Sequence, residues 1–243
     1  NIGYTLYYAT NFIFAGLAVA LAAHGGLFNI GGNGQAYVAG LGVIIVALAL
    51  QNTHWLIVAP AALVAAAVFG GAWAFIPGYL QAKRGSHVVI TTIMFNFIAS
   101  ALMIYMLNRV LKPAGVSGPE SAMIAESGRM PKLGSFFAPF NYTPVNLSIF
   151  IAILALVGVY ILLWHTKFGY ALRVMGQNPT AARYAGISNS RMIIVTMTLS
   201  GALAGLVAFN EVLGVQNRLV LDFMGDVGFV GIAVALMGRN HPI

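Results

Sequence analysis

Three side-chain amides lie close together in a glycine-rich stretch of the sequence, at Asn29, Asn33 and Gln35. Each amide carries donors and an acceptor, so the group suits uncharged sugar hydroxyls or the edges of a purine. The same residue types also cap and turn the backbone locally. We predict that these amides line a path for an uncharged polar solute, with local capping as the alternative.

A fourth amide, Asn96, lies near the middle of the apolar run 88–107. An amide at that depth in a membrane is costly unless it has a partner. Asn96 is therefore expected either to face the solute or to hydrogen bond to another helix. Phe95 and Phe209 offer ring faces on which a base or a sugar could stack, and packing is the alternative for both rings.

The sequence holds no catalytic or metal-binding pattern. It has no cysteine, and its five histidines are scattered singly without a His-Glu-x-x-His spacing. Glu211, Asp222 and Asp226 are spaced as solvated charges on an external loop rather than as metal ligands. Because no phosphate-binding Gly-x-x-x-x-Gly-Lys run occurs, ATP would have to be bound by another polypeptide. We expect no cofactor and no catalytic residue in this chain.

A short polar segment carries start and stop signals for a helix. Asn178 followed by Pro179 fits an N-cap and a first helical position, and Gly186 fits the left-handed residue after a helix end. These signals predict a helix over 179–185 that is too short and too polar to cross a membrane. Such a helix is suited to contact by a partner protein. A connector lying at the membrane interface is the alternative.

The surrounding elements are those of a membrane protein. Of 243 residues, 60% are hydrophobic and 7% charged, against roughly 45–50% and 25% in soluble domains. Five apolar runs approach or exceed the length needed to cross a bilayer, and all 12 basic and 5 acidic residues fall outside them. The runs are 4–23, 55–76, 88–107, 147–164 and 192–209. Because the net charge of +7 forms no stripe, no nucleic-acid polymer is expected as a partner.

The basic residues indicate the orientation of the chain. Residues 77–87 and 165–191 hold lysine and arginine without any acid, which predicts that both are cytoplasmic. Residues 108–146, rich in proline, glycine and serine, then form a large external loop.

Two further apolar runs, 36–50 and 227–238, are too short to cross a membrane alone. Glycine-punctuated stretches, 24–35 and 222–231, lead into them. Broken helices in corresponding positions of two halves indicate a transporter's binding site and suggest an inverted repeat. Close packing of helices is the alternative reason for the glycines.

Four stretches, in this order, resemble the membrane subunit of bacterial ABC importers for branched-chain amino acids, ribose-type sugars and nucleosides. They are residues 29–35, 90–98, 168–187 and 231–242, and they look most like the nucleoside and simple-sugar permeases. The resemblance covers nearly the whole chain. It implies one permease domain over 1–243, an all-α polytopic transmembrane bundle with short or broken helices at a central site. It also implies that spans are missing at both ends, because such permeases are longer.

The resemblance implies partners as well. The short capped helix resembles the coupling helix that sits in a groove of the ATPase subunit. The residues that would contact the ATPase are Gln177, Asn178, Pro179, Ala182, Arg183 and Gly186. A second permease subunit or a copy of this chain, an external substrate-binding protein and a bacterial inner membrane are implied too, with ATP bound by the ATPase subunit.

The sequence therefore predicts the permease subunit of an ATP-driven importer rather than an enzyme. No lysine or arginine lies in a span to hold a carboxylate or phosphate, so a neutral, ring-bearing solute is expected, a nucleoside before a simple sugar. A single-chain facilitator or channel is one alternative, which would need a pore-lining ring of charges or carbonyls. An intramembrane enzyme is the other, and it has no motif.

Overall fold

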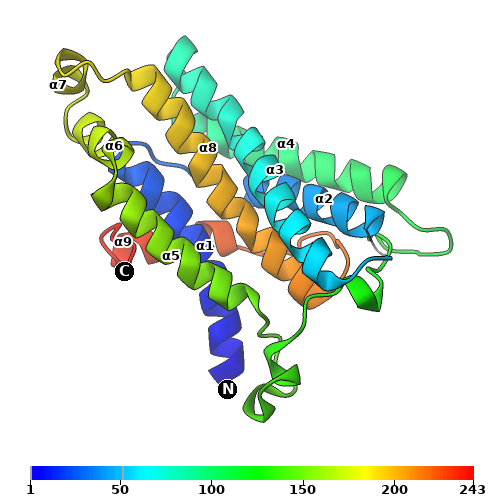
Figure 1. Ribbon diagram of the computed structural model, residues 1–243. Coiled ribbons are helices and arrows are strands. Elements are labelled where there is room, and N and C mark those ends of the chain that lie inside the picture. Colours follow the sequence, from blue (N-terminus) through cyan, green and yellow to red (C-terminus); the bar gives the residue numbers. More distant parts are fainter. Residues whose placement is uncertain (1, 51) are drawn as a thin grey trace.

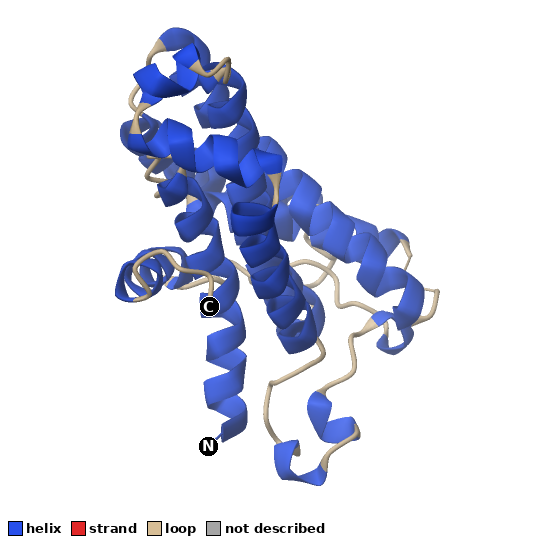
Figure 2. Ribbon diagram, turned by 60° about the vertical axis from the view of Figure 1, so that its left-hand side comes forward, coloured by secondary structure: helices blue, strands red, loops and turns tan. Residues whose placement is uncertain are grey.

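The computed structural model describes residues 2–50 and 52–243 (Figure 1). The described residues form helices and loops and no strand (Figure 2). The helices are α1 (Ile2–His24), α2 (Gly32–Ala49), α3 (Trp55–Arg84), α4 (Val88–Tyr105), α5 (Ser148–His165), α6 (Lys167–Gln177), α7 (Pro179–Tyr184), α8 (Asn189–Ala208) and α9 (Val227–Met237). α4 continues as a π-helical turn, η1 (Met106–Val110), and α8 as a longer one, η5 (Phe209–Gln216). Three 3-10 turns, η2 (Glu126–Gly128), η3 (Leu133–Ser135) and η4 (Ala138–Phe140), lie in the long loop before α5.

Six of these helical stretches, among the residues that the structure describes, are long and apolar enough to cross a membrane. They are Ile2–His24, Gly32–Ala49, Trp55–Arg84, Val88–Val110, Ser148–His165 and Asn189–Gln216. The predicted all-α transmembrane fold is confirmed, and α9, at 11 residues, is a short apolar helix as expected.

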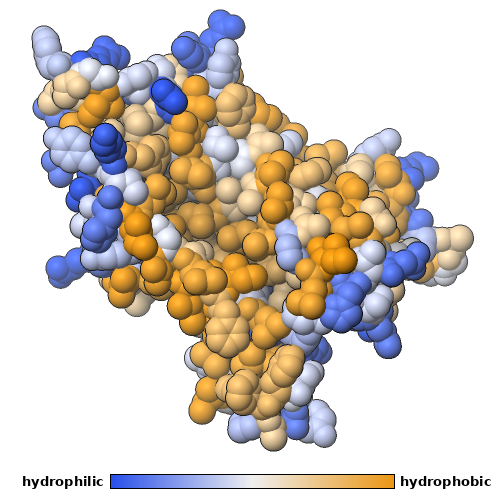
Figure 3. Space-filling model, viewed as in Figure 1, coloured by the Kyte–Doolittle hydropathy of each residue, from blue (hydrophilic) through white to orange (hydrophobic). Residues whose placement is uncertain are grey.

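The spans divide into an inner and an outer group. In α1, α2 and α8, 61% of the most apolar window is buried inside the protein, against 22% in α4 and α5. The outer helices turn large apolar side chains such as Phe97 and Leu154 outward, and apolar residues cover much of the face seen in Figure 3. Since lipid is as apolar as these side chains, such a surface suits a bilayer.

α3 and α8 pack closely because glycines face each other across them. A Cβ on Gly201 would collide with Ala74 and with the backbone of Gly70, and a Cβ on Gly205 would collide with the carbonyl of Ala66. Small residues let membrane helices approach until their backbones touch. This contact fixes α8 at the centre of the bundle, between α3 and α1 (Figure 1).

Two sequence-based boundaries are wrong. The apolar run 36–50 was expected to be too short for a span, but α2 begins four residues earlier, at Gly32, and reaches 18 residues. Glu211 was expected on an external loop that follows the run 192–209, but η5 carries the helix on to Gln216. In both places side chains from distant elements supply hydrogen bonds that let polar or glycine-rich sequence stay helical.

Candidate functional site

Asn29 and Gln35 form a reciprocal amide pair between the α1–α2 loop and the first turn of α2. Asn29 Nδ2 donates to Gln35 Oε1 and Gln35 Nε2 donates to Asn29 Oδ1, each over 3.0 Å. Asn29 Nδ2 also donates to Ser200 Oγ on α8 (2.8 Å), and Ser200 donates to the carbonyl of Ala18 on α1 (2.6 Å). The three polar side chains are at most 2% exposed. This network ties three inner helices together at the start of α2.

Asn96 reaches from α4 to the same place. Its Oδ1 accepts from the N–H of Gly34 (2.9 Å) and its Nδ2 donates to the carbonyl of Ile30 (2.8 Å). Ile30 and Gly34 are four residues apart, the spacing of a backbone hydrogen bond in an α-helix. The side-chain amide of Asn96 therefore bonds to the two backbone groups, Ile30 C=O and Gly34 N–H, that would otherwise form a backbone hydrogen bond at the start of α2. A Cβ on Gly34 would lie 2.8 Å from Asn96 Oδ1, so only glycine leaves room for this contact.

Asn33 joins the two glycine-rich stretches. Its Oδ1 accepts from the N–H of Gly228 in the first turn of α9 (2.8 Å), and its Nδ2 lies 3.4 Å from the carbonyl of Gly225. A Cβ on Gly32 would lie 3.3 Å from the Cα of Gly228. The starts of α2 and α9, nearly 200 residues apart in sequence, therefore meet backbone to backbone.

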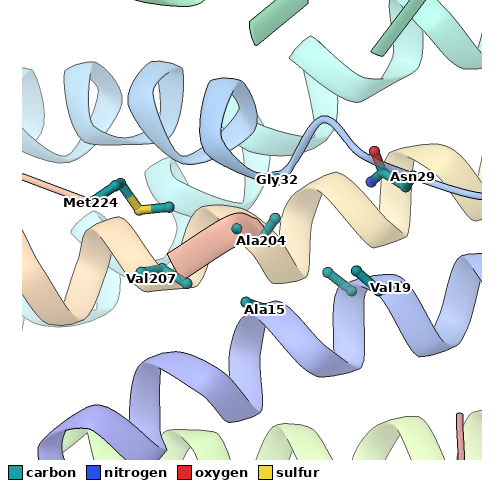
Figure 4. A pocket seen from close by; sticks show the side chains of 9 residues that line it. Ala15, Val19, Asn29, Gly32, Ala204, Val207 and Met224 are labelled. Carbon is teal, nitrogen blue, oxygen red and sulfur yellow. The ribbon is translucent and has the colours of Figure 1, made fainter. Parts of the chain in front are cut away.

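A narrow cavity lies beside this meeting point, between α1, α8 and the starts of α2 and α9 (Figure 4). It is lined by Ala15, Ala18, Val19, Asn29, Gly32, Ala204, Val207, Met224 and Gly228. Asn29 is the one polar side chain of that set. The cavity admits little more than a water molecule, so a nucleoside or sugar would fit only after the helices separate.

The aromatic candidates lie apart from one another. Phe95 packs its ring at 5.3 Å from that of Trp73 on α3, whose indole N–H donates to the Phe95 carbonyl (3.3 Å). Phe209 is fully buried in the hydrophobic core. The structure thus brings Asn29, Asn33, Gln35 and Asn96 together around the start of α2. Phe209 is not part of this group.

Glu211 departs from its predicted setting. It was expected to be a solvated charge on an external loop, but it lies in η5 and is 3% exposed. The hydroxyl of Tyr7 and the Nδ2 of Asn11, both on α1, donate to Glu211 Oε1, the second over 2.6 Å. These two neutral donors and a further hydrogen bond from Gln216 hold the carboxylate inside the bundle, as a buried charged group requires.

The Glu211 contacts continue into a chain of buried amides that the sequence analysis missed. Asn210 Nδ2 donates to Asn11 Oδ1 (2.8 Å), and Asn210 Oδ1 accepts from Asn146 Nδ2 (2.8 Å) and Ser148 Oγ (2.6 Å). Each of these side chains is 1% exposed. The chain fastens α1 and η5 to the start of α5. Its sequence signal is weak: Tyr7 and Asn11 are one helical turn apart in an otherwise apolar run.

At the far end of the bundle, the short helix α7 has the predicted caps. Asn178 Oδ1 accepts from the N–H groups of Thr180 and Ala181, both at 3.0 Å. α7 ends at Tyr184, one residue before the predicted end, and Gly186 adopts a left-handed φ of +77°.

α7 projects from the bundle, as Figure 1 shows. Gln177, Pro179, Arg183 and Gly186 are exposed, whereas Ala182 is buried and packs the helix onto its neighbours. Asn178 is exposed too, so five of the six residues expected to contact an ATPase are exposed, and Ala182 is buried.

Comparison with known proteins defines the class. The whole chain, residues 1–243, matches the family described as the permease component of the branched-chain amino acid transport system. The chain belongs to this family and is a multi-pass membrane protein of a transport system. No solved structure matches it.

Its relatives include the guanosine ABC transporter permease of Bacillus subtilis, with 37% identity over 100% of this chain and 68% of the relative. The nucleoside ABC transporter permease of Lactococcus lactis has 35% identity over 100% of this chain and 68% of the relative. The glucose ABC transporter permease of Haloferax volcanii has 32% identity over 97% of this chain and 63% of the relative. The predicted resemblance is confirmed.

Proposed function

We propose that this chain is the membrane-spanning subunit of an ATP-driven importer in a bacterial inner membrane. The observation that carries the proposal is α7, a short helix with caps at both ends. Five of the six residues expected to contact an ATPase are exposed, and Ala182 is buried against the bundle. A rigid, protruding helix of this kind suits the groove of a separate ATPase subunit, which would bind the ATP. A second permease subunit or a copy of this chain, and an external substrate-binding protein, complete the assembly.

The solute in this proposal is a nucleoside or, second, a simple sugar. Two of the relatives are permeases for nucleosides and one is a permease for glucose. In this chain the start of α2 gathers uncharged amides, and the described spans carry lysine and arginine only in their terminal turns. Asn29, Asn33, Gln35, Phe95, Asn96 and Phe209 stay our predicted solute path. Alternating access would separate α2 from α9 and widen the cavity of Figure 4.

The coupling role of α7 can be tested with the intact complex in vesicles. Gly186→Val places a Cβ in a left-handed conformation, which costs roughly 1–2 kcal/mol and frays or re-aims the helix end. Arg183→Glu reverses an exposed charge at the expected contact. Both variants should insert and fold, yet lose ATPase association or solute-stimulated ATP hydrolysis.

Gly115→Val is the matched control, since Gly115 also has a positive φ, of +84°, with open space around it, but lies in the long loop. It should leave hydrolysis unchanged. A double variant of Gly186 and Arg183 with normal stimulated hydrolysis and normal uptake would refute the coupling role.

The solute is tested separately by uptake of labelled guanosine in competition with unlabelled nucleosides, glucose and amino acids. We expect nucleosides to compete best and Asn33→Ala to lower uptake while the complex still assembles. Strong uptake of a charged amino acid, with no competition from nucleosides or sugars, would show that the proposed solute class is wrong.

A further inference from the structure

The long loop before α5 divides into a charged half and an uncharged half. Residues 109–132 hold four basic and two acidic side chains, whereas residues 133–147, up to the start of α5, hold no lysine, arginine, aspartate or glutamate. Part of the uncharged stretch, 133–143, folds into a small lobe built on η3 and η4. The lobe lies at the end of the bundle opposite α7 (Figure 1).

The lobe is held in place on its inner side. Leu133 and Val145 are buried, and the N–H of Leu133 donates to the carbonyl of Val145 (2.9 Å). Thr143 is 5% exposed, and its side chain packs directly against Gly3 of α1. A Cβ on Gly3 would lie only 2.5 Å from Thr143 Cγ2. Its hydroxyl donates to the carbonyl of Phe140 (2.7 Å), which closes the turn. The lobe is therefore an ordered structure docked on the first turn of α1.

The outer side of the lobe is aromatic and uncovered. Phe136 is 61% exposed, Phe137 55% and Tyr142 100%. Tyr4 and Tyr8 on the adjoining end of α1 are about half exposed. Apolar residues accordingly dominate this end of the molecule in Figure 3. Exposed aromatic groups of this extent mark a binding surface rather than a surface in contact with water.

We propose that this aromatic lobe, residues 133–143, lies in the headgroup region of the bilayer and inserts Phe136, Phe137 and Tyr142 among the lipids. Its surface is continuous with the lipid-facing sides of two spans. α1 carries Tyr4 and Tyr8 beside it, and α5 follows it directly with Phe150, 52% exposed, in its first turn. Aromatic side chains with a polar end are enriched at this depth, and the exposed Lys132 at the lobe's boundary suits lipid phosphate.

The lipid bilayer explains the division of the loop better than a protein partner does. A protein docking surface would gain on-rate and specificity from charge, yet the charges are confined to the other half of the loop. An uncharged, aromatic segment just before a span instead suits the interface, where aromatic side chains lie at the level of the headgroups.

The absence of cysteine from the chain makes a direct test possible. Single cysteines at Phe137 and Tyr142 are spin-labelled in the intact protein, in nanodiscs of phosphatidylethanolamine and phosphatidylglycerol. Collision with oxygen, which concentrates in lipid, is compared with collision with a water-soluble nickel chelate. Ala114→Cys, exposed in the charged half of the loop, is the control for water, and Leu154→Cys, 69% exposed on α5, is the control for lipid.

We expect the oxygen-to-nickel collision ratio at Phe137→Cys and Tyr142→Cys to exceed that at Ala114→Cys and to correspond to a depth of roughly 5–10 Å. A ratio equal to that at Ala114→Cys would place the lobe in water and overturn the proposal. Protection from both reagents would mean that a protein covers the lobe, either a second copy or a binding protein, and would overturn it as well. Because no solute or ATPase takes part, the result is independent of the proposed transport function.

Discussion

Replacing Asn96 with alanine should loosen the start of α2 by an amount that the structure allows us to estimate. The substitution removes two hydrogen bonds between helices, to Gly34 N–H and to the Ile30 carbonyl. Hydrogen bonds between membrane helices average about 0.6 kcal/mol each and reach about 1.7. The expected loss of unfolding free energy is therefore about 1–3 kcal/mol. The low end applies if Ile30 and Gly34 then close the backbone bond themselves.

A matched control lies on the same helical stretch. Asn108 is exposed, and its amide donates to the carbonyl of Ile104 within its own helix (2.8 Å). Asn108→Ala should change stability by less than about 0.5 kcal/mol. Thermal unfolding of the two purified variants in one detergent measures the difference, which should be roughly 2–4 °C per kcal/mol for a protein of this size.

Uptake adds a second readout for Asn96. Because the amide sets where α2 begins, Asn96→Ala should lower solute uptake more than its stability loss explains, while Asn108→Ala leaves uptake unchanged. If Asn96→Ala unfolds at the same temperature as Asn108→Ala and transports normally, then the amide does not position α2 and the interpretation of this contact is wrong.

Two other substitutions test the packing and the buried carboxylate. Gly201→Val should lower the free energy of unfolding by about 1–3 kcal/mol because it overpacks the α3–α8 contact. Gly158→Val is the control, since a Cβ there meets open space, and it should have little effect in the same thermal assay. Equal melting temperatures of the two variants would contradict the close contact of glycines between α3 and α8. Glu211→Leu should leave the donors of Tyr7 and Asn11 unpaired at about 1–3 kcal/mol each, and Glu211→Gln, which keeps an acceptor oxygen, should recover most of that stability. Failure of the glutamine variant to recover stability would mean that the negative charge itself is required.

The spans and the caps of α7 were predictable because their signals are local. Asn178, Pro179 and Gly186 lie within nine residues of one another, and the geometry of a capped helix follows from that spacing alone. The start of α2 was missed since Asn96, which replaces its first backbone bond, is more than 60 residues away. Glu211 was assigned to a loop because an isolated charge is costly in a span, and its two donors on α1 are some 200 residues distant.

The contact of α1 with helices made some 200 residues later has a consequence for the biosynthesis of this chain. Asn11 finds its partners in Asn210 and Glu211, and α1 packs mainly on α8 and α9. At a synthesis rate of roughly 5–20 residues per second, α1 waits in the membrane for about 10–40 s before those helices are made. Throughout that time the Asn11 amide lacks its partners on η5. We therefore expect newly inserted α1 to depend on the insertion machinery or a lipid-embedded chaperone, and nascent chains that end before α8 to be degraded.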